Sequence, residues 1–274
     1  MFMQKTVLIT GSSSGIGKTT AHYFLEHGWN VIATMRSPEK ETELNKHPNC
    51  LVTRLDVSDE KSIESAIDQG LKRFQKIDVL VNNAGYGLMG VLEGMSIEQI
   101  KKQFDTNVFG LLLVTQKILP YFRKQNSGTI INISSVAGRV AFPLFSLYHG
   151  TKWAVEGISE SLQYELSPFN IKVKCVEPGA IKTDFYDRSA DNNLKTTPDA
   201  YLKFAHYMLN KTNQAGSLGK KPIAVARVIY RAANDQSFKL RYQEGLEIKF
   251  FLFMRQMMPT SLFRKLVQFS LRLS

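Results

Sequence analysis

The stretch TVLITGSSSGIG, residues 6–17, passes from a short β-branched run directly into a turn with glycines at positions 11, 15 and 17. Runs rich in Val, Ile and Thr are typical of strands, and the residues after the turn, 15–27, have the length and periodicity of a helix. Gly11, Gly15 and Gly17 permit a tight turn in which backbone N–H groups and a helix N-terminus face a pyrophosphate. A glycine-rich turn can also serve packing alone. On the first strand of a doubly wound sheet, however, it indicates a dinucleotide site.

The same alternation of strand-like and helix-like segments continues outward from this stretch to about residue 180. Further strand-like runs are NVIATM, LVTRLDV, DVLVNN, GTIINIS and IKVKCVEP, with a seventh strand near FKLRYQ. Regular strand–helix–strand succession implies parallel strands joined by right-handed crossovers. We therefore expect an α/β fold in which residues 1–274 form a single Rossmann-type domain. Its sheet is doubly wound, parallel and seven-stranded, with helices on both faces and a loop-rich insertion at 184–222.

Composition excludes several classes of protein. The chain has 274 residues, 43% of them hydrophobic, which is typical of a globular protein. Its net charge of +11 is spread along the sequence, so we expect a solvated basic surface and no nucleic-acid partner. No apolar run is long enough to span a membrane, and the N-terminus lacks the pattern of a signal peptide. Two unpaired cysteines, Cys50 and Cys175, favour a reducing compartment, and we expect a cytoplasmic protein.

A tyrosine and a lysine stand four residues apart in SLYHGTKWAVEG, residues 146–157. Side chains at i and i+4 share one face of a helix, so Tyr148 and Lys152 can reach the same point in a cleft. His149 points about 100° away from Tyr148 on that helix, and we assign it no catalytic role. His22, His27, His47 and His206 form no cluster with one another, so we expect no metal site.

Several further motifs occur in one order along residues 5–185. They are NNAG at 82–85, LDVS at 55–58, FDTNVFG around Asn107, INISSVAG around Ser135, and EPG at 177–179, which is followed by Ile181 and Thr183. Ser135 precedes Tyr148 by 13 positions. Together with the glycine turn, these motifs resemble the short-chain dehydrogenase/reductase family, in its shorter single-domain branch. The chain looks most like the hydroxysteroid and retinol dehydrogenases of that family.

The resemblance implies a catalytic tetrad of Asn107, Ser135, Tyr148 and Lys152. Tyr148 would exchange a proton with the substrate oxygen, which Ser135 would orient. Lys152 would hold the nicotinamide ribose and lower the pKa of the tyrosine, and Asn107 would support a water that links the lysine to solvent. Taken alone, Asn107 can equally be a helix-bend residue, and Ser134 is the nearest rival to Ser135.

The resemblance also implies a set of cofactor contacts and an assembly. The expected cofactor-binding residues are Gly11, Ser13, Ser14, Gly15, Ile16, Gly17, Arg36, Asp56, Val57, Asn83, Ala84, Gly85, Tyr148, Lys152, Pro178, Gly179, Ile181 and Thr183. Relatives commonly form dimers or tetramers through the helices that contain Asn107 and Tyr148, so we expect a homodimer or homotetramer.

The end of the second strand bears on the choice of cofactor. An acid at this place binds the ribose 2′-OH of NAD, whereas an arginine accommodates the 2′-phosphate of NADP. The sequence VIATMRSPEK has no acid there and continues with Arg36. Some relatives that prefer NADP carry a basic residue in the glycine turn, but here Ser12, Ser13 and Ser14 occupy those places. We expect NADP(H) to be preferred, with NAD(H) still possible.

The substrate is less defined than the reaction. The expected lid, 184–222, contains Phe185, Tyr186, Tyr201, Phe204, Tyr207 and Met208. These residues either contact a steroid-, retinoid- or lipid-like alcohol or carbonyl, or they pack the lid onto the domain. We expect an NADP(H)-dependent alcohol dehydrogenase or carbonyl reductase. The alternatives are a 3-oxoacyl reductase of fatty-acid synthesis and a non-catalytic NADP(H)-binding sensor.

The C-terminal segment, residues 245–274, is both apolar and basic. Pro259 is expected to divide it into two short helices. Such a segment can lie in a membrane interface, cover the substrate cleft or be buried at a subunit contact. The membrane is the less favoured of these partners, because related chains with a similar segment are often soluble.

Overall fold

The architecture is a seven-stranded parallel sheet, seen in a computed structural model that describes residues 4–182, 190–192 and 194–271. In spatial order the strands are β3 (Cys50–Arg54), β2 (Asn30–Met35), β1 (Thr6–Ile9), β4 (Val79–Asn82), β6 (Gly128–Ile133), β7 (Ile171–Glu177) and β9 (Arg241–Gln243). The order runs outward from β1 in both directions, as expected for a doubly wound sheet. A crevice therefore forms between β1 and β4, where the winding reverses.

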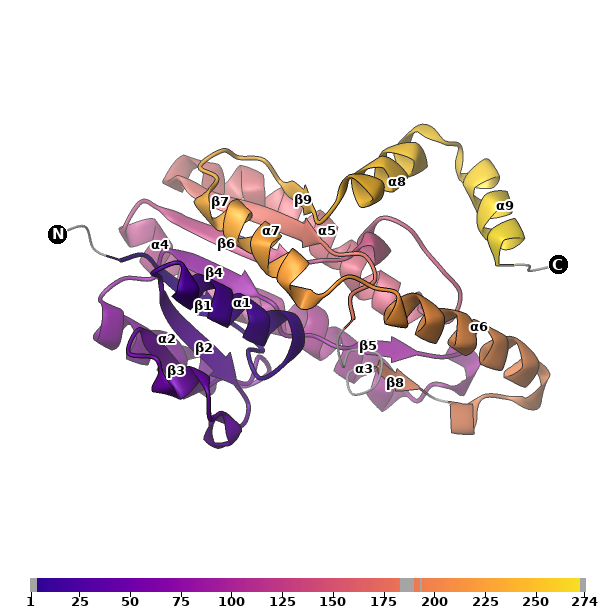
Figure 1. Cartoon of the computed structure of the whole chain (residues 1–274), viewed down its shortest axis with the longest axis horizontal. Coiled ribbons are helices and arrows are strands. Elements are labelled where there is room, and N and C mark those ends of the chain that lie inside the picture. Colours follow the sequence, from indigo (N-terminus) through magenta and orange to yellow (C-terminus); the bar gives the residue numbers. More distant parts are fainter. Residues whose placement is uncertain (1–3, 183–189, 193, 272–274) are drawn as a thin grey trace.

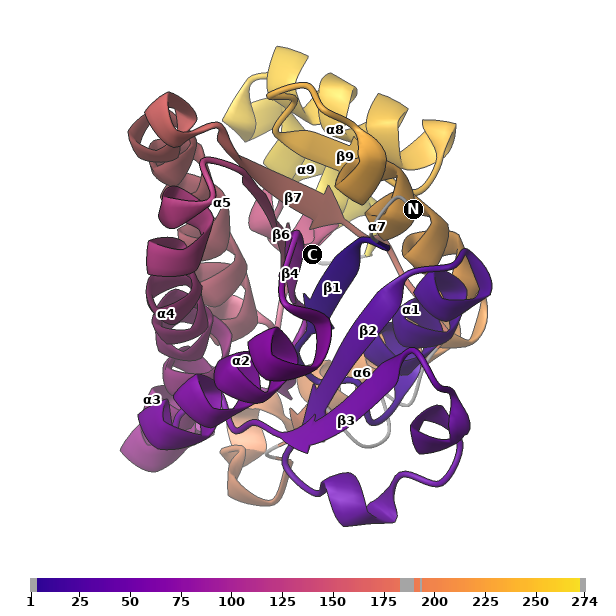
Figure 2. The same cartoon turned by 90° about the vertical axis from the view of Figure 1, so that its left-hand side faces the viewer.

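Helices cover both faces of the sheet (Figure 2). The helices α1 (Gly15–Glu26) and α7 (Pro222–Asn234) pack on one face. The helices α2 (Glu60–Phe74), α4 (Gly110–Lys124) and α5 (Ser146–Leu166) lie on the other. Successive residues of β1 alternate between these layers, with Val7 and Ile9 in one core and Leu8 in the other. Because both faces are covered, all four residues of the strand are buried.

A π-helical segment joins α3 (Ile97–Phe104) to α4. It spans Asp105–Phe109 and follows α3 without a break. A capping box begins α3, in which Ser96 Oγ accepts from Gln99 N and Gln99 Oε1 accepts from Ser96 N. π-Helical turns are rare and often lie beside functional sites. This one carries Asn107.

The segment at 184–222 differs from expectation. We expected it to be rich in loops, but it contains α6 (Asp199–Ser217), a helix of 19 residues. A second, two-stranded parallel sheet was also not expected, and it pairs β5 (Gly87–Met89) with β8 (Ala190–Asn192). This small sheet joins the segment after β4 to the one before α6 (Figure 1).

The C-terminal residues form two helices divided at Pro259, as the sequence predicted. They are α8 (Leu246–Met257) and α9 (Thr260–Ser270), and Figure 1 shows them standing beside the body of the molecule, beyond β9. Short 3₁₀ turns cover Pro38–Lys40, Leu44–Lys46, Leu92–Gly94, Val136–Gly138, Ser167–Phe169 and Leu194–Thr196. Within the described part of the chain, no helix has the length and apolarity needed to cross a bilayer.

Candidate active site

A large pocket opens at the carboxyl ends of the strands, where a doubly wound sheet binds its ligands. Its volume of about 1590 Å³ exceeds the roughly 300–1,000 Å³ of most small-molecule sites, so it has room for two ligands end to end. The expected cofactor-binding residues that line it are Gly11, Ser13, Ser14, Gly15, Ile16, Gly17, Arg36, Asp56, Val57, Asn83, Ala84, Gly85, Tyr148, Lys152, Pro178, Gly179 and Ile181. Thr183 lies outside the described residues.

The glycine turn forms one wall of this pocket. Gly11 and Gly15 have φ of +69° and +55°, a region that favours glycine. A side chain at position 17 would place its Cβ 2.2 Å from the carbonyl oxygen of Gly11, so only glycine fits there. Helix α1 starts at Gly15, and the side chain of Ser14 does not cap it. The first N–H groups of the helix therefore remain available to an anion.

Asn83 braces this turn from the neighbouring strand. Its Nδ2 donates to the carbonyl oxygens of Thr10 and Gly11, at 2.9 and 3.0 Å. The hydroxyl of Thr10 in turn accepts from the N–H groups of Asn83 and Ala84, each at 3.0 Å. The segments after β1 and β4 are thus joined across the crevice, which fixes the shape of the turn.

Arg36 and Asp56 follow the ends of β2 and β3 at the same side of the pocket. The Arg36 side chain is exposed and lines the pocket. The Asp56 carboxylate accepts from Ser58 N at 3.0 Å and from Ser58 Oγ at 2.7 Å. The two residues place one cation and one anion at the far end of the pocket from Lys152.

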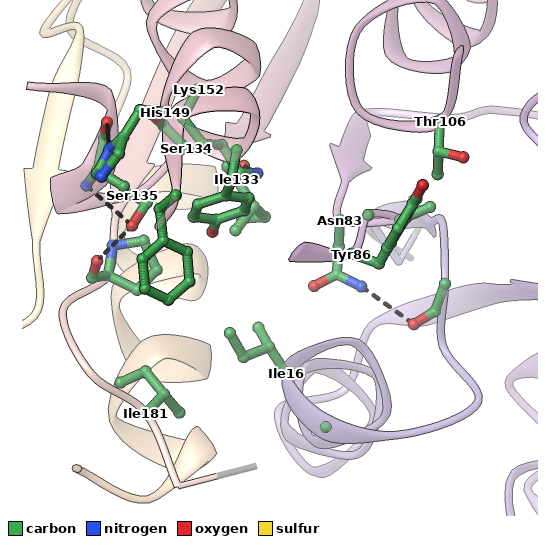
Figure 3. A pocket seen from close by; sticks show the side chains of 18 of the residues that line it. Ile16, Asn83, Tyr86, Thr106, Ile133, Ser134, Ser135, His149, Lys152 and Ile181 are labelled. Carbon is green, nitrogen blue, oxygen red and sulfur yellow. Dashed lines mark hydrogen bonds between the residues drawn. The ribbon is translucent and has the colours of Figure 1, made fainter. Parts of the chain in front are cut away.

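Ser135, Lys152 and Ile133 lie on one side of the pocket, and Asn83 and Tyr86 lie on the other (Figure 3). Ser135 is half-buried. Its Oγ accepts from Ala137 N at 3.1 Å and donates to Pro178 O at 3.3 Å. Ser134 also lines the pocket, but its Oγ is out of contact with solvent. Of the two serines, Ser135 is the more accessible to a ligand.

Lys152 is buried beside Tyr148, on the helix α5. Its Nζ lies 5.6 Å from the centre of the Tyr148 ring and donates to Ile133 O at 2.7 Å. Burial lowers the pKa of Lys152 to about 8, because the charged form is poorly solvated there. The ammonium is still the main form at neutral pH. The expected pair therefore shares one helix face at the pocket, with a positive charge next to the phenol.

His149 lines the pocket, but both of its ring nitrogens are engaged with backbone. Nε2 accepts from Phe142 N at 2.8 Å, and Nδ1 lies 2.8 Å from Ala137 O. Because a carbonyl oxygen only accepts, Nδ1 carries the hydrogen. Burial lowers the pKa of this histidine, which keeps the ring neutral. Its side chain ties the segment after β6 to α5.

Asn107 lies behind the pocket wall and does not line it. The side chain is 2% exposed, and its Oδ1 accepts from Tyr86 N at 3.0 Å. Its Nδ2 donates to Tyr86 O at 2.8 Å and to Thr151 Oγ1 at 3.2 Å. The structure thus brings three members of the expected tetrad to the pocket and places the fourth one layer further back, where it joins the segment after β4 to α5.

A buried cluster of charges behind Lys152 was not anticipated from the sequence. Arg241 Nε lies 3.0 Å from Glu156 Oε2 and 3.6 Å from Glu177 Oε1, and Arg139 reaches Glu177 Oε1 at 3.2 Å. Burial, with Glu156 nearby, raises the pKa of Glu177 to about 7. The signal in the sequence was the acid itself, since Glu177 interrupts an otherwise apolar strand end before Pro178.

The other end of the pocket is mostly apolar. It is lined by Val136, Phe142, Phe145, Met208, Ala215, Ile248, Phe251 and Leu271, with Lys211 and Thr212 among them. Of the lid residues singled out in the sequence, Met208 lines the pocket, whereas Phe204 and Tyr207 pack in a core cluster with Leu144. Phe185 and Tyr186 lie outside the described residues. The helix α8 and Leu271, which follows α9, contribute to this wall, a role that the sequence left open.

Among the described residues, no group of His, Cys, Asp or Glu could hold a metal ion. The two cysteines are free, as expected, with Cys175 buried and Cys50 half-buried.

Comparison with known proteins gives consistent matches. The sequence profile of the short chain dehydrogenases matches residues 5–194. An uncharacterized oxidoreductase YusZ of Bacillus subtilis is 38% identical over 97% of this chain and 98% of its own length. A 3-ketodihydrosphingosine reductase of Bacteroides thetaiotaomicron is 42% identical over 71% of each chain.

A solved structure of a short-chain dehydrogenase from Streptomyces avermitilis superposes with a TM-score of 0.85. It is 32% identical, and the match covers 98% of this chain and 97% of that one. The branch of hydroxysteroid and retinol dehydrogenases is not distinguished by these matches. The profile, the relatives and the fold agree that the chain belongs to the short-chain dehydrogenase/reductase family, whose members are oxidoreductases that bind a nicotinamide cofactor.

Proposed function

We propose that the protein is an NADP(H)-dependent oxidoreductase that interconverts an apolar alcohol and its carbonyl. The observation that carries this proposal is the side of the pocket opposite Asn83, where Lys152 and Ser135 lie (Figure 3). Tyr148, beside Lys152 on α5, also lines the pocket, to which the glycine turn and an apolar cavity both contribute. The glycine turn would hold a dinucleotide, and the apolar cavity would hold the substrate.

The pocket fits a dinucleotide on structural grounds. The turn at residues 11–17 has no room for side chains at Gly17, and the uncapped N-terminus of α1 offers N–H groups to a pyrophosphate. Asp56 and Val57 line the end suited to adenine, and Lys152 lies at the opposite end. When bound there, the nicotinamide supplies or accepts the hydride at the substrate carbon.

The side chains of this protein handle the proton. In the direction of reduction, the Tyr148 hydroxyl gives its proton to the carbonyl oxygen, and in oxidation it takes one from the alcohol. The ammonium of Lys152 favours the phenolate by charge, since an opposite charge stabilises the ionised form. Ser135 Oγ, held by Ala137 N, hydrogen-bonds the same substrate oxygen and orients it. Asn107 acts indirectly, through the positions of Tyr86 and α5.

The preference for NADP(H) rests on Arg36. Its exposed guanidinium follows β2 and lines the pocket, and the residue that ends β2 is Met35. An arginine can pair with a phosphate through two parallel hydrogen bonds, and β2 ends in Met35 where an acid would bind a 2′-OH.

An apolar, lipid-like substrate is supported by two observations. The walls beyond Ser135 are made by Phe142, Phe145, Ile248 and Phe251, which favour apolar ligands. The relative from Bacteroides thetaiotaomicron acts, by its name, on 3-ketodihydrosphingosine. We further infer a homodimer or homotetramer through α4 and α5, because Trp153 and Tyr164 of α5 are 50% and 72% exposed.

A panel of carbonyls and alcohols, followed at the NADPH absorbance band with NADH in parallel, tests this function. We expect turnover of apolar members with NADPH in preference to NADH. Tight NADPH binding without turnover of any member would contradict the enzyme and favour a cofactor sensor. Equal rates with the two cofactors would contradict the preference alone.

A further inference from the structure

The helices α8 and α9 form a C-terminal hairpin, residues 246–270, with an apolar outer face. On α8, Phe250, Phe253 and Met257 are 64%, 56% and 67% exposed. On α9, Leu266 and Phe269 are 47% and 84% exposed. Side chains of this kind are normally buried, so their concentration on one small element indicates a surface that meets another apolar phase.

The spacing shows that these residues form continuous faces. Positions 250, 253 and 257 follow i, i+3, i+7 and therefore lie on one side of α8. Positions 262, 266 and 269 follow the corresponding pattern on α9. The opposite side of α8 is occupied, because Leu252 packs on Val136 and Val140 in a core cluster. The helix α8 thus has two apolar sides, one that packs on the rest of the protein and one that is exposed.

The hairpin carries only positive charge beside this face. From residue 248 to the end of the sequence there is no Asp or Glu. At about 100° per residue, Lys249 and Lys265 lie beside the apolar faces of their helices, and Arg264 lies further round α9. Arg255 lies over the Phe263 ring at 4.8 Å, on the packed side of the hairpin. Glu247, the one acid in α8, pairs with Lys220 outside the hairpin. The outer face therefore suits a partner that has an apolar interior and an anionic surface.

We infer that the outer face of the C-terminal hairpin docks the protein onto an anionic lipid bilayer. Apolar residues with flanking cations on short helices match the physics of interfacial binding, in which side chains enter the acyl boundary and cations meet headgroups. A second copy of the chain fits this face less well than a bilayer does. In a two-fold contact the cations of one hairpin would face the same cations of the other, and like charges repel.

The hairpin also forms a wall of the active-site pocket. Ile248 and Phe251 of α8 and Leu271 after α9 line its apolar end. A bilayer bound to the outer face would therefore lie against the element that encloses the substrate. This consequence rests on the proposed function, whereas the docking itself does not require catalysis.

Vesicle flotation of the full chain tests the docking directly. Vesicles of phosphatidylcholine alone are compared with vesicles that also contain phosphatidylglycerol, at low and at high salt. We expect binding to the anionic vesicles, and weaker binding at high salt because screening removes the electrostatic part. A Phe253→Trp variant should be quenched by brominated lipid in the anionic vesicles, which reports insertion of the side chain.

Two variants separate the apolar and the charged contributions. Phe253→Ser with Met257→Ser removes apolar contact, and Arg264→Gln with Lys265→Gln removes charge. Burial of one large apolar side chain changes an equilibrium by roughly tenfold or more, so the first variant should lose at least ~10-fold in partitioning. Leu218→Ser, exposed on another element, and Arg123→Gln with Lys124→Gln on α4 are the matched controls, which we expect to bind as the unchanged chain does.

The results that would overturn the proposal are distinct from a failure of the enzyme assay. Absence of flotation with anionic vesicles, or equal flotation of the Phe253/Met257 variant, contradicts docking whether or not the protein turns over substrate. Light scattering of the same variants completes the test. A smaller particle mass for the hairpin variant, without any vesicle binding by the unchanged chain, would assign the face to a subunit contact instead. Thermal unfolding at an unchanged temperature shows that a variant is folded, and Leu262→Ser with Leu266→Ser repeats the test on α9.

Discussion

Tyr148 is the residue whose hydroxyl carries the proposed proton transfer. Replacement of Tyr148 by Phe keeps the ring and removes only the hydroxyl, so the fold and the cofactor pocket remain. General acid–base groups contribute about 10²–10⁴-fold to a rate, and we expect kcat to fall by that amount while the Kd for NADPH is unchanged. Steady-state kinetics and fluorescence titration measure the two quantities. Tyr23→Phe, on α1 and outside the pocket, is the control. Substantial activity of Tyr148→Phe would show that Tyr148 is not the proton donor.

Arg36 is the residue that should select between the two cofactors. Hydrogen bonds to charged groups are worth about 1.5–3 kcal/mol, which corresponds to roughly 10- to 100-fold in kcat/KM. Replacement of Arg36 by Asp should lower kcat/KM for NADPH by this factor and raise it for NADH, since a carboxylate repels a phosphate and accepts from a ribose hydroxyl. Arg123→Asp makes the same charge change on α4 and should leave the ratio unaltered. An unchanged ratio in Arg36→Asp would exclude it as the selector.

Glu177 connects the buried charge cluster to the pH dependence of stability. Its pKa in the folded protein is about 7, above the ordinary value of 4.5, because burial penalises the carboxylate. The folded state therefore holds a proton that the unfolded chain releases, and the free energy of unfolding falls as pH rises from about 4.5 to about 7. The slope is about 1.4 kcal/mol per pH unit at most.

Glu177→Gln removes this titration, and urea unfolding at several pH values measures the outcome. We expect the free energy of unfolding of the unchanged protein to fall more steeply between about pH 5 and 7 than that of Glu177→Gln. His149 is present in both the unchanged protein and Glu177→Gln, so its effect on the free energy of unfolding cancels in the comparison. Glu160→Gln, which removes a more exposed partner of Arg241, should keep the steeper slope. Parallel curves for Glu177→Gln and the unchanged protein would show that Glu177 does not titrate in this range.

The π-helical segment Asp105–Phe109 shows how an element can depend on a single side chain. Asn107 satisfies both the N–H and the carbonyl of Tyr86. Replacement by Ala leaves the N–H of Tyr86 without that partner, whereas the Tyr86 carbonyl still accepts from Gln103 Nε2 at 2.9 Å. Loss of one such buried hydrogen bond costs about 1–3 kcal/mol, so we expect the free energy of unfolding to fall by about that amount, as measured by urea unfolding. Asn213→Ala, on the exposed side of α6, should change it little, and an equal effect of both substitutions would refute the positioning role.

The elements that the sequence predicted are those defined by local pattern. Strand β1 and the start of α1 follow from a β-branched run and from glycines whose φ values require them. The sequence also predicted strand β7, but it did not predict that the lysines of this strand are buried. Lys172 and Lys174 suggest a solvated face, yet all seven of its residues are buried. Lys174 is accommodated by Ala232 O at 2.9 Å and Tyr242 OH at 3.2 Å, partners that lie far along the chain and leave no local signal.

Contacts between residues far apart in the sequence also explain why helix α6 was not predicted. Helix α6 was taken for loop because its mixed polar and aromatic residues show no strong period, and packing of Ala205 and Met208 against Leu144 stabilises it instead. In the site, the resemblance to the family pointed to Tyr148, Lys152 and Ser135, which all line the pocket. Glu156, Glu177 and Arg241 meet only in the folded sheet. Local motifs therefore point to the proposed reacting groups, whereas the charged residues that surround these groups are known only from the structure.

At the scale of the whole molecule, the pocket has two ends built by different parts of the chain. The turns after β1 to β4 make the end proposed for the cofactor, and they lie within the residues that the family profile matches. The helix α6 and the C-terminal hairpin make the apolar end. A substitution in the hairpin should therefore alter the handling of substrate and leave the binding of cofactor intact.

Phe251→Ala tests this division, because Phe251 of α8 lines the apolar end and is half-buried. Loss of a large aromatic side chain removes roughly 1.5–3 kcal/mol of apolar contact, so KM for a long apolar substrate should rise about tenfold or more. The Kd for NADPH should not change, because no cofactor-binding turn is affected. Phe253→Ala, two positions along on the outer face of the same helix, is the matched control and should keep the KM of the unchanged enzyme. Equal KM values for the two variants, or a weaker affinity for NADPH in Phe251→Ala, would show that the hairpin does not form the substrate end of the pocket.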